Sequence, residues 1–207
     1  MRLQALALSL LAVAGLATPV RRAFGEHSFT LRLSSKDKSL DGQYLTTLSG
    51  AGRANTTSLV AYASSSKPGD EFIKFSPVVD PDTKLAELRT PSSTSDAALA
   101  VVGSNGLFDF ASVPDPDGTA DELPEGTTVD WTSFRLKEEG DVRTVEYGRS
   151  NAAAKGGWFA FPIRESKASE KGEAWGIKWK EESAFTTTDY LPVKILVEPV
   201  YVIAKDE

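Results

Sequence analysis

The sequence predicts an all-β, single-domain protein with little helix, folded as an antiparallel β-sandwich, jelly roll or barrel-like structure. Many short segments alternate apolar and polar residues with a period of two, which is the pattern of a half-buried strand. Clusters of Gly, Pro, Asp and Ser separate these segments at short intervals. In contrast, no long stretch repeats its apolar positions with a helical period, and the best helical candidate, 165–173, has almost no apolar face.

The first strand is expected at 28–33, because Phe29, Leu31 and Leu33 lie on one face and polar residues on the other. The same pattern predicts the remaining strands at 44–48, 58–63, 72–79, 97–102, 107–110, 129–136, 142–147, 158–163, 175–180 and 191–203. Between Trp131 and Phe134 the apolar phase slips by one residue, which indicates a bulge within that strand.

The last strand, 191–203, has a clear apolar phase that includes Pro199. Proline cannot donate a ladder hydrogen bond, so this segment is either an edge strand or two strands joined at a bend. A long loop is expected at 113–126, the most polar and Pro-rich internal segment. Within it, 115–122 holds four carboxylates and a turn glycine, but their spacing does not match a calcium loop, and an acidic solvated turn explains them better.

The amino-terminal residues predict export. A short basic start precedes an apolar run at 5–17, so residues 1–17 are expected to form a signal peptide cleaved after Ala17, rather than a membrane anchor, which needs roughly 20 apolar residues. The pair Arg21 and Arg22 indicates either a second, dibasic cleavage that removes 18–22 as a short pro-segment or an ordinary basic flank. The mature domain then spans 23–207, and we expect it to be secreted, outside the cell or in the cell wall.

Composition restricts the partners. Removing 1–22 takes away three arginines and no acidic residue, so the formal charge changes from −6 to about −9. Such an acidic chain is expected to bind neither nucleic acid nor, after processing, a membrane. The chain has no cysteine, which excludes disulfides, a thiol nucleophile and thiolate metal sites.

Catalytic patterns are weak. His27 is the only histidine, and no G-x-S-x-G motif accompanies it, so a serine hydrolase is not expected. A carboxylate pair for glycoside cleavage is defined by its distance in space, and 29 acidic residues leave it unspecified. Glu146 and Glu173 lie in or beside strands, where charged residues on a solvent face are the ordinary explanation. The sequence nominates no catalytic, metal-binding or cofactor-binding residue.

Two aromatic-rich strands differ in their expected orientation. Both tryptophans of 175–180 fall in one phase and are expected in the core. In 158–163, Phe159 and Phe161 occupy the phase opposite Trp158 and would take the core, which leaves Trp158 and Ala160 facing outward or into a second layer. An exposed tryptophan there could stack on a sugar ring; the alternative is a strand buried on both faces.

One covalent modification is expected. Asn55 begins an N-glycosylation motif, Asn-Thr-Thr, in a probable loop of an exported chain. The alternative is an unmodified polar turn. No other segment carries a comparable modification signal.

The segment Leu40-Asp41-Gly42-Gln43-Tyr44-Leu45, together with the Gly50-Ala51-Gly52 turn and the aromatic strand at 107–110, resembles an uncharacterised family of small secreted fungal proteins. The same N-terminal layout of this chain is also similar, more faintly, to that of fungal conidial cell-wall proteins. Those proteins usually carry cysteines, which this chain lacks. The resemblance covers mainly the first half of the mature chain; the polar stretch before Leu107 and the C-terminal third depart from it. It implies export and a β-rich fold, and no catalytic residues.

These observations favour a non-catalytic protein that binds a polysaccharide or a protein at the cell wall or at another extracellular or host surface. One alternative is a secreted polysaccharide hydrolase or lyase with a carboxylate pair. Another is an effector-like protein that binds only other proteins.

Overall fold

The structure is a computed structural model that describes residues 28–48, 56–63, 72–91, 97–148, 155–163 and 173–200. The all-β prediction is confirmed: these residues form thirteen strands and one short helix, and every strand pair is antiparallel. The leader with Arg21 and Arg22, His27, Asn55 and all of the helical candidate at 165–173 except Glu173 lie outside the described residues. Among the described elements, the single seven-residue helix is too short to cross a membrane.

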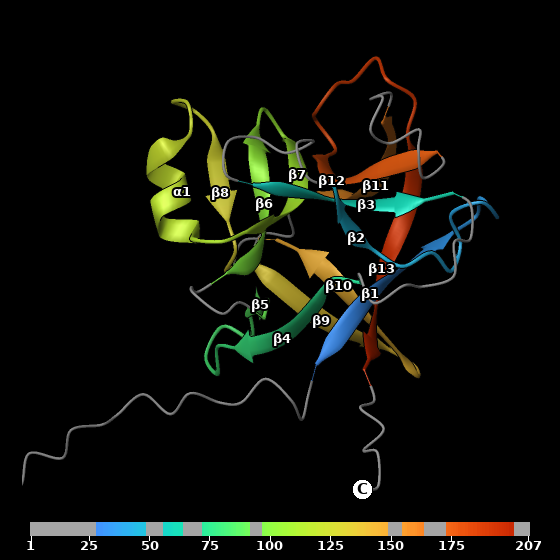
Figure 1. The fold of residues 1–207 in the computed structure, drawn as a ribbon, viewed down its shortest axis with the longest axis horizontal. Helices are drawn as coiled ribbons and strands as arrows, with labels where there is room; N and C mark the ends of the chain where they lie inside the picture. The colour runs from blue at the N-terminus through green and yellow to red at the C-terminus, as the bar shows by residue number, and fades with distance from the viewer. Residues whose placement is uncertain are drawn as a thin grey trace, which may run out of the picture.

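The elements follow one another along the chain as β1 Phe29–Ser35, β2 Thr46–Leu48, β3 Thr57–Tyr62, β4 Lys74–Val79, β5 Ala86–Arg89, β6 Ala98–Ser104, β7 Leu107–Val113, α1 Pro116–Glu122, β8 Thr128–Asp130, β9 Phe134–Glu139, β10 Val142–Tyr147, β11 Gly156–Ile163, β12 Ala174–Glu181 and β13 Leu191–Pro199 (Figure 1). Most of them match the expected strands to within a few residues.

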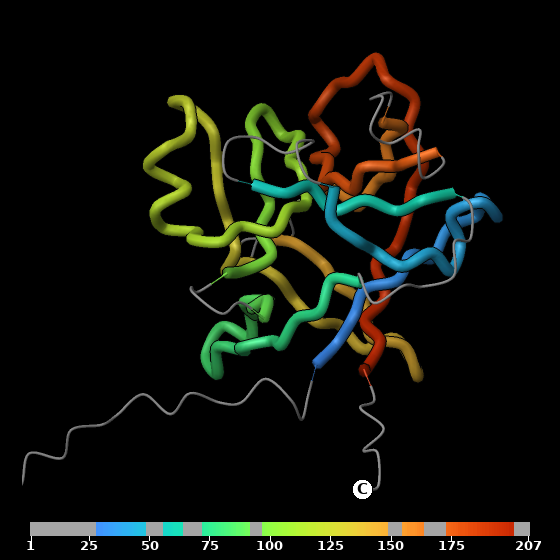
Figure 2. Tube along the Cα trace, viewed as in Figure 1, coloured from blue at the N-terminus to red at the C-terminus, as the bar shows by residue number. Residues whose placement is uncertain are grey.

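The strands form one continuous sheet that closes on itself. Its order is β1-β4-β5-β9-β10-β13-β11-β12-β3-β7-β6-β8, with β2 on β3, and the additional β1–β13 pairing closes β1, β4, β5, β9, β10 and β13 into a ring. Figure 1 shows β13 running from the upper group of strands into the lower one. The first and last strands lie side by side (Figure 2), in register from Phe29↔Pro199 to Ser35↔Val193. β13 therefore belongs to both parts of the sheet.

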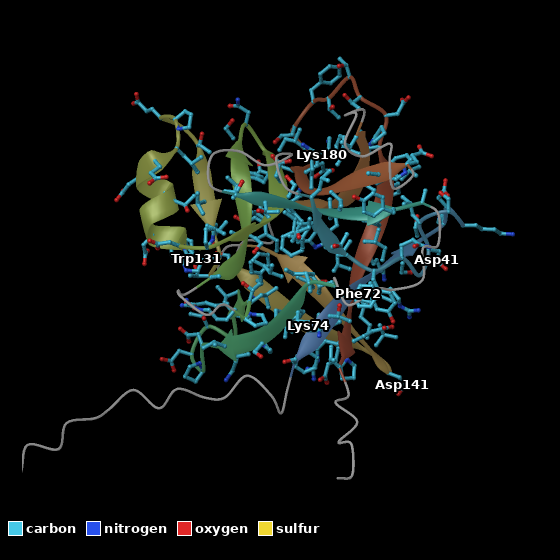
Figure 3. All side chains as sticks on the ribbon, viewed as in Figure 1. Asp41, Phe72, Lys74, Trp131, Asp141 and Lys180 are labelled. Carbon is cyan, nitrogen blue, oxygen red and sulfur yellow. The ribbon has the colours of Figure 1, made fainter. Side chains whose placement is uncertain are left out.

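Side chains fill the space that the sheet encloses (Figure 3). Phe110, Phe134 and Trp158 form an aromatic centre, in which ring centroids lie 5.7 and 4.8 Å from that of Phe110. A second, smaller cluster lies on the other face of β6 and β7, where Trp131 packs against it near α1. Because β6 is covered on both faces, Ala98 to Gly103 are all buried.

Three sequence-based expectations are wrong. The expected loop at 113–126 contains α1, which Asp115 caps by accepting a hydrogen bond from the Gly118 amide at 3.2 Å. The segment 129–136, expected as one bulged strand, is instead divided between two strands. β8 pairs with β6, and β9 pairs with β10. Of the two alternatives for 191–203, the edge strand is wrong, because β13 pairs on both sides and Pro199 is its last residue. The other alternative, two strands joined at a bend, involves 201–203, which lie outside the described residues.

Candidate functional site

On one edge of β13, the two strands that pair with it, β10 and β11, diverge from each other. We call the gap between them the β13 fork. Leu191 to Val193 pair with β11, and Leu196 and Val197 pair with β10. Lys194 and Ile195, between these two short ladders, pair with neither strand on this edge. A gap therefore opens within the sheet.

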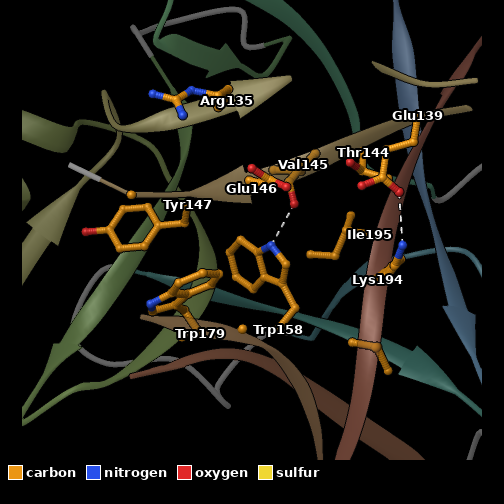
Figure 4. A pocket seen from close by; sticks show the side chains of 14 residues that line it. Arg135, Glu139, Thr144, Val145, Glu146, Tyr147, Trp158, Trp179, Lys194 and Ile195 are labelled. Atoms are coloured by element: carbon orange, nitrogen blue, oxygen red, sulfur yellow. Dashed lines mark hydrogen bonds and ion pairs between the residues drawn. The ribbon is translucent and has the colours of Figure 1, made fainter. Parts of the chain in front are cut away.

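A pocket of about 610 Å³ occupies this fork, a size within the roughly 300–1,000 Å³ of typical ligand sites. Its lining comes from β9, β10, β11, β12 and β13. Figure 4 shows charged side chains of β9 and β10 on one side and two tryptophans on the other. The pocket thus connects a polar mouth with the aromatic core.

Glycines at the start of β11 leave room for the fork. A Cβ atom on Gly156 would lie 2.6 Å from the Lys180 carbonyl oxygen and 2.9 Å from the Trp179 ring, so only glycine fits without a shift. A Cβ on Gly157 would meet nothing closer than 3.4 Å. Pro192 of β13, which pairs with Phe159 of β11, has no amide hydrogen to donate to the β11–β13 ladder.

Trp158 spans the fork. Its indole N–H donates to the Val145 carbonyl oxygen at 2.8 Å (Figure 4), so this side chain takes the place of a missing strand partner for β10. Only 5% of Trp158 is exposed. The expectation that it faces outward is wrong, because Trp158 points into the core. The alternative, a strand covered on both faces, fits better, because Phe161 on the opposite face is also only 4% exposed and packs with Phe159 against Tyr190.

Three aromatic residues form the floor. Tyr147 and Trp158 both contact Trp179 edge to face, with centroids 5.4 and 5.3 Å from it. The Tyr147 hydroxyl donates to the buried Asp130 carboxylate at 2.9 Å, which fixes the ring. Of the two tryptophans expected in the core, Trp179 is buried there, whereas Trp175 is only partly buried and packs against the core. The pocket therefore has a rigid apolar floor made mainly of ring edges.

Trp179 differs from Trp158 in its polar atom. Its side chain is only 4% exposed, and its indole nitrogen has no hydrogen-bond partner among the residues that the structure describes. Trp175 on the same strand also has an unpartnered indole nitrogen, but it does not line the pocket. An unsatisfied buried donor at a pocket is a feature that a ligand oxygen could complete.

Charged side chains form the mouth. Lys137 binds both Glu146 and Glu139, with Nζ–O distances of 3.1 and 3.2 Å, and Lys194 binds Glu139 at 2.9 Å. Hydrogen bonds from Lys194 and then Lys137 lower the pKa of Glu139 below its usual value. Hydrogen bonds to Glu146 and then Glu139 raise the pKa of Lys137. Arg135, paired in register with Glu146, also lines the pocket.

The carboxylates of Glu139 and Glu146 both bind the Lys137 ammonium group, so they lie within two ion-pair lengths of each other. A glycosidase general acid needs a raised pKa, whereas the pKa of Glu139 is lowered. Within the described ranges, no group of three or more His, Cys, Asp or Glu residues could hold a metal ion.

The other acidic candidates lie elsewhere. The 115–122 run forms α1 with its cap, and Glu173 precedes β12. Of the residues weighed from the sequence, the pocket brings together Trp158, Glu146 and Trp179. Arg135, Glu139 and Lys194 were missed, because only the strand order places β9, β10 and β13 side by side.

A scan against protein-family models, a search of curated proteins and a search of solved structures each found no match to this chain. The site must therefore be interpreted from its own geometry.

Proposed function

We propose that this protein is secreted, is not an enzyme, and binds a saccharide of a cell wall or extracellular polymer in the pocket at the β13 fork. The observation that supports this most is the combination of an aromatic floor with a mouth of hydrogen-bonding groups in one pocket of ligand size. Sugars present apolar C–H surfaces beside hydroxyl groups, and an amphipathic site of this kind matches both.

The pocket floor is preorganised, which lowers the entropic cost of binding. Tyr147 and Trp158 are each held by a hydrogen bond, and Trp179 packs against both. The mouth is flexible by comparison, because its lysine and glutamate side chains are partly exposed. A rigid floor would position the sugar ring while the mouth adjusts to its hydroxyl groups.

A hydrolase or lyase is the less favoured function. It would need one carboxyl group protonated near neutral pH, while the lysines stabilise the charged form of Glu139. Binding without cleavage requires no such proton.

The test is a depletion assay with the purified mature protein, residues 23–207. It is mixed with insoluble chitin, β-glucan, cellulose and mannan and with immobilised polygalacturonate, and the supernatant is assayed for protein and for released reducing sugar. We expect selective depletion without sugar release. Sugar release would replace this proposal with the enzyme, and no depletion from any polymer would replace it with a protein ligand.

A matched pair of variants locates the site. Glu146→Phe places a bulky side chain at the pocket mouth and should abolish depletion. Glu138→Phe makes the same change on the same hairpin, at a residue that pairs with Arg143 and does not line the pocket. Equal loss in both variants, or in neither, would contradict the pocket as the binding site.

A further inference from the structure

The hydrogen-bonding groups of the pocket are not used equally. Both carboxylates already accept from lysines: Glu139 from Lys194 and Lys137, and Glu146 from Lys137. Among the residues that the structure describes, the lining polar side chains without any hydrogen-bond or ion-pair partner are those of Arg135 and Trp179, and both are donors.

Arg135 is an exposed cation at the mouth. In the part of the chain that the structure describes, its guanidinium makes no hydrogen bond or ion pair. On the same hairpin, Arg143 binds Glu138 at 2.8 Å. Guanidinium groups bind carboxylates through two parallel hydrogen bonds, and Arg135 is free to do so with a ligand.

Trp179 supplies the second free donor. Its indole N–H is buried, has no acceptor among the described residues, and belongs to a pocket-lining side chain (Figure 4). Trp158, which faces it across the strand pair, has its N–H bound to Val145. A buried donor without an acceptor is unfavourable, so a ligand that shifts the pocket wall enough to bring an oxygen to this enclosed nitrogen would be stabilised by the new hydrogen bond.

The local charge points in the same direction. Arg135 and Lys194 line the pocket together with Glu139 and Glu146, and Lys137, which does not line the pocket, binds both carboxylates and adds a third cation beside it. The whole chain, in contrast, carries a formal charge of −6. A local positive excess on an acidic protein favours an anionic group at this place and disfavours general binding of polyanions elsewhere.

Resting on the function proposed above, we infer that the ligand is an acidic saccharide, a chain of uronic acid units. One carboxylate binds the Arg135 guanidinium, and another oxygen of the sugar accepts the hydrogen bond from the Trp179 indole. The aromatic floor contacts the apolar surface of the same unit.

The probes are short oligogalacturonates and their methyl esters, which keep the backbone and remove the charge. Calorimetric titration into the mature protein should show binding of the acid at least about tenfold tighter than that of the ester. Raising the salt concentration should weaken binding of the acid, because the pair is partly exposed. Equal affinity for acid and ester would overturn the acidic ligand and leave the saccharide proposal standing.

Two matched pairs of variants test the residues. Arg135→Gln should remove the preference for the acid, whereas Arg143→Gln should keep it. Trp179→Phe should weaken binding severalfold, whereas Trp175→Phe removes an equally unpartnered indole away from the pocket and should not. Because Arg135 is exposed, its variant should fold normally, and circular dichroism of each variant checks this.

The outcomes separate the two proposals. Binding of β-glucan, chitin, cellulose or mannan without binding of the oligogalacturonate overturns the acidic ligand only. No binding of any saccharide overturns both. An acid preference that survives Arg135→Gln also overturns the inference.

Discussion

The two edges of β13 carry the same strand but have opposite structures. Along one edge β1 pairs without interruption, from Phe29↔Pro199 to Ser35↔Val193. Along the other edge the ladder is divided between β11 and β10, and Lys194 and Ile195 remain between them. The continuous edge stabilises the fold, and the divided edge provides the pocket. A single strand therefore supplies both the stability and the candidate binding site.

The largest expected effect is on the continuous edge. Leu33 is fully buried in β1 opposite Ile195, so Leu33→Ala should lower the free energy of unfolding by about 2–5 kcal/mol. Lys194→Ala, on the divided edge and largely exposed, should change it by less than about 0.5 kcal/mol. Urea denaturation measures both, and similar losses in the two variants would contradict the division of roles.

The next effect tests the side chain that spans the fork. Trp158→Phe keeps an aromatic ring but leaves the Val145 carbonyl oxygen without its donor, which should cost about 1–3 kcal/mol. Trp175→Phe removes an indole N–H that has no partner, so its loss should be smaller. Denaturation of the two variants gives the comparison; an equal cost would mean that the Trp158 hydrogen bond contributes little.

The glycines at the fork should differ from each other. Gly156→Ala forces its Cβ against the Lys180 carbonyl and the Trp179 ring and should cost about 1–3 kcal/mol. Gly157→Ala meets only ordinary contacts and should change stability by less than about 0.5 kcal/mol. Thermal unfolding distinguishes them, and a neutral Gly156→Ala would show that the pocket wall can move.

The smallest effect concerns the charges at the mouth. Lys194 and Lys137 lower the pKa of Glu139, so this contribution to stability is present above the pKa of the unfolded chain and is lost as the pH falls through the folded value. Lys194→Gln should raise the pKa of Glu139 toward its usual value. Lys178→Gln, whose ammonium binds Asp109 instead, should leave it unchanged. Carboxyl ¹³C NMR titration measures these values, and an unaltered pKa in Lys194→Gln would contradict the pairing.

Local patterns sufficed for most of the fold. Period-two alternation is a property of a single segment, and it identified β10 as a strand and β1 and β12 as strands with the correct inward faces. The missed elements, β5 and α1, are too short to display a period. The predicted orientation of β11 was wrong because both of its faces carry aromatic residues, and alternation alone does not show which face lies in the core.

The candidate site was harder to predict from the sequence than the fold. Its chemistry depends on which strands are neighbours, and that is decided by contacts between distant segments. Glu139 and Lys194 form an ion pair only because β10 lies between β9 and β13. Trp158 was recognised as unusual from the sequence, but its partner, a backbone carbonyl on another strand, had no sequence signal.

The β1–β13 pairing also determines when the chain can fold. The first described strand has its full-length partner in the last one, and it meets β4 only at Phe29 and Thr30. Contacts between residues so far apart in the sequence make folding slow. The ring of strands cannot close until β13 has been synthesised, so a chain still growing on the ribosome lacks the partner of its first described strand and becomes compact only when synthesis is nearly finished.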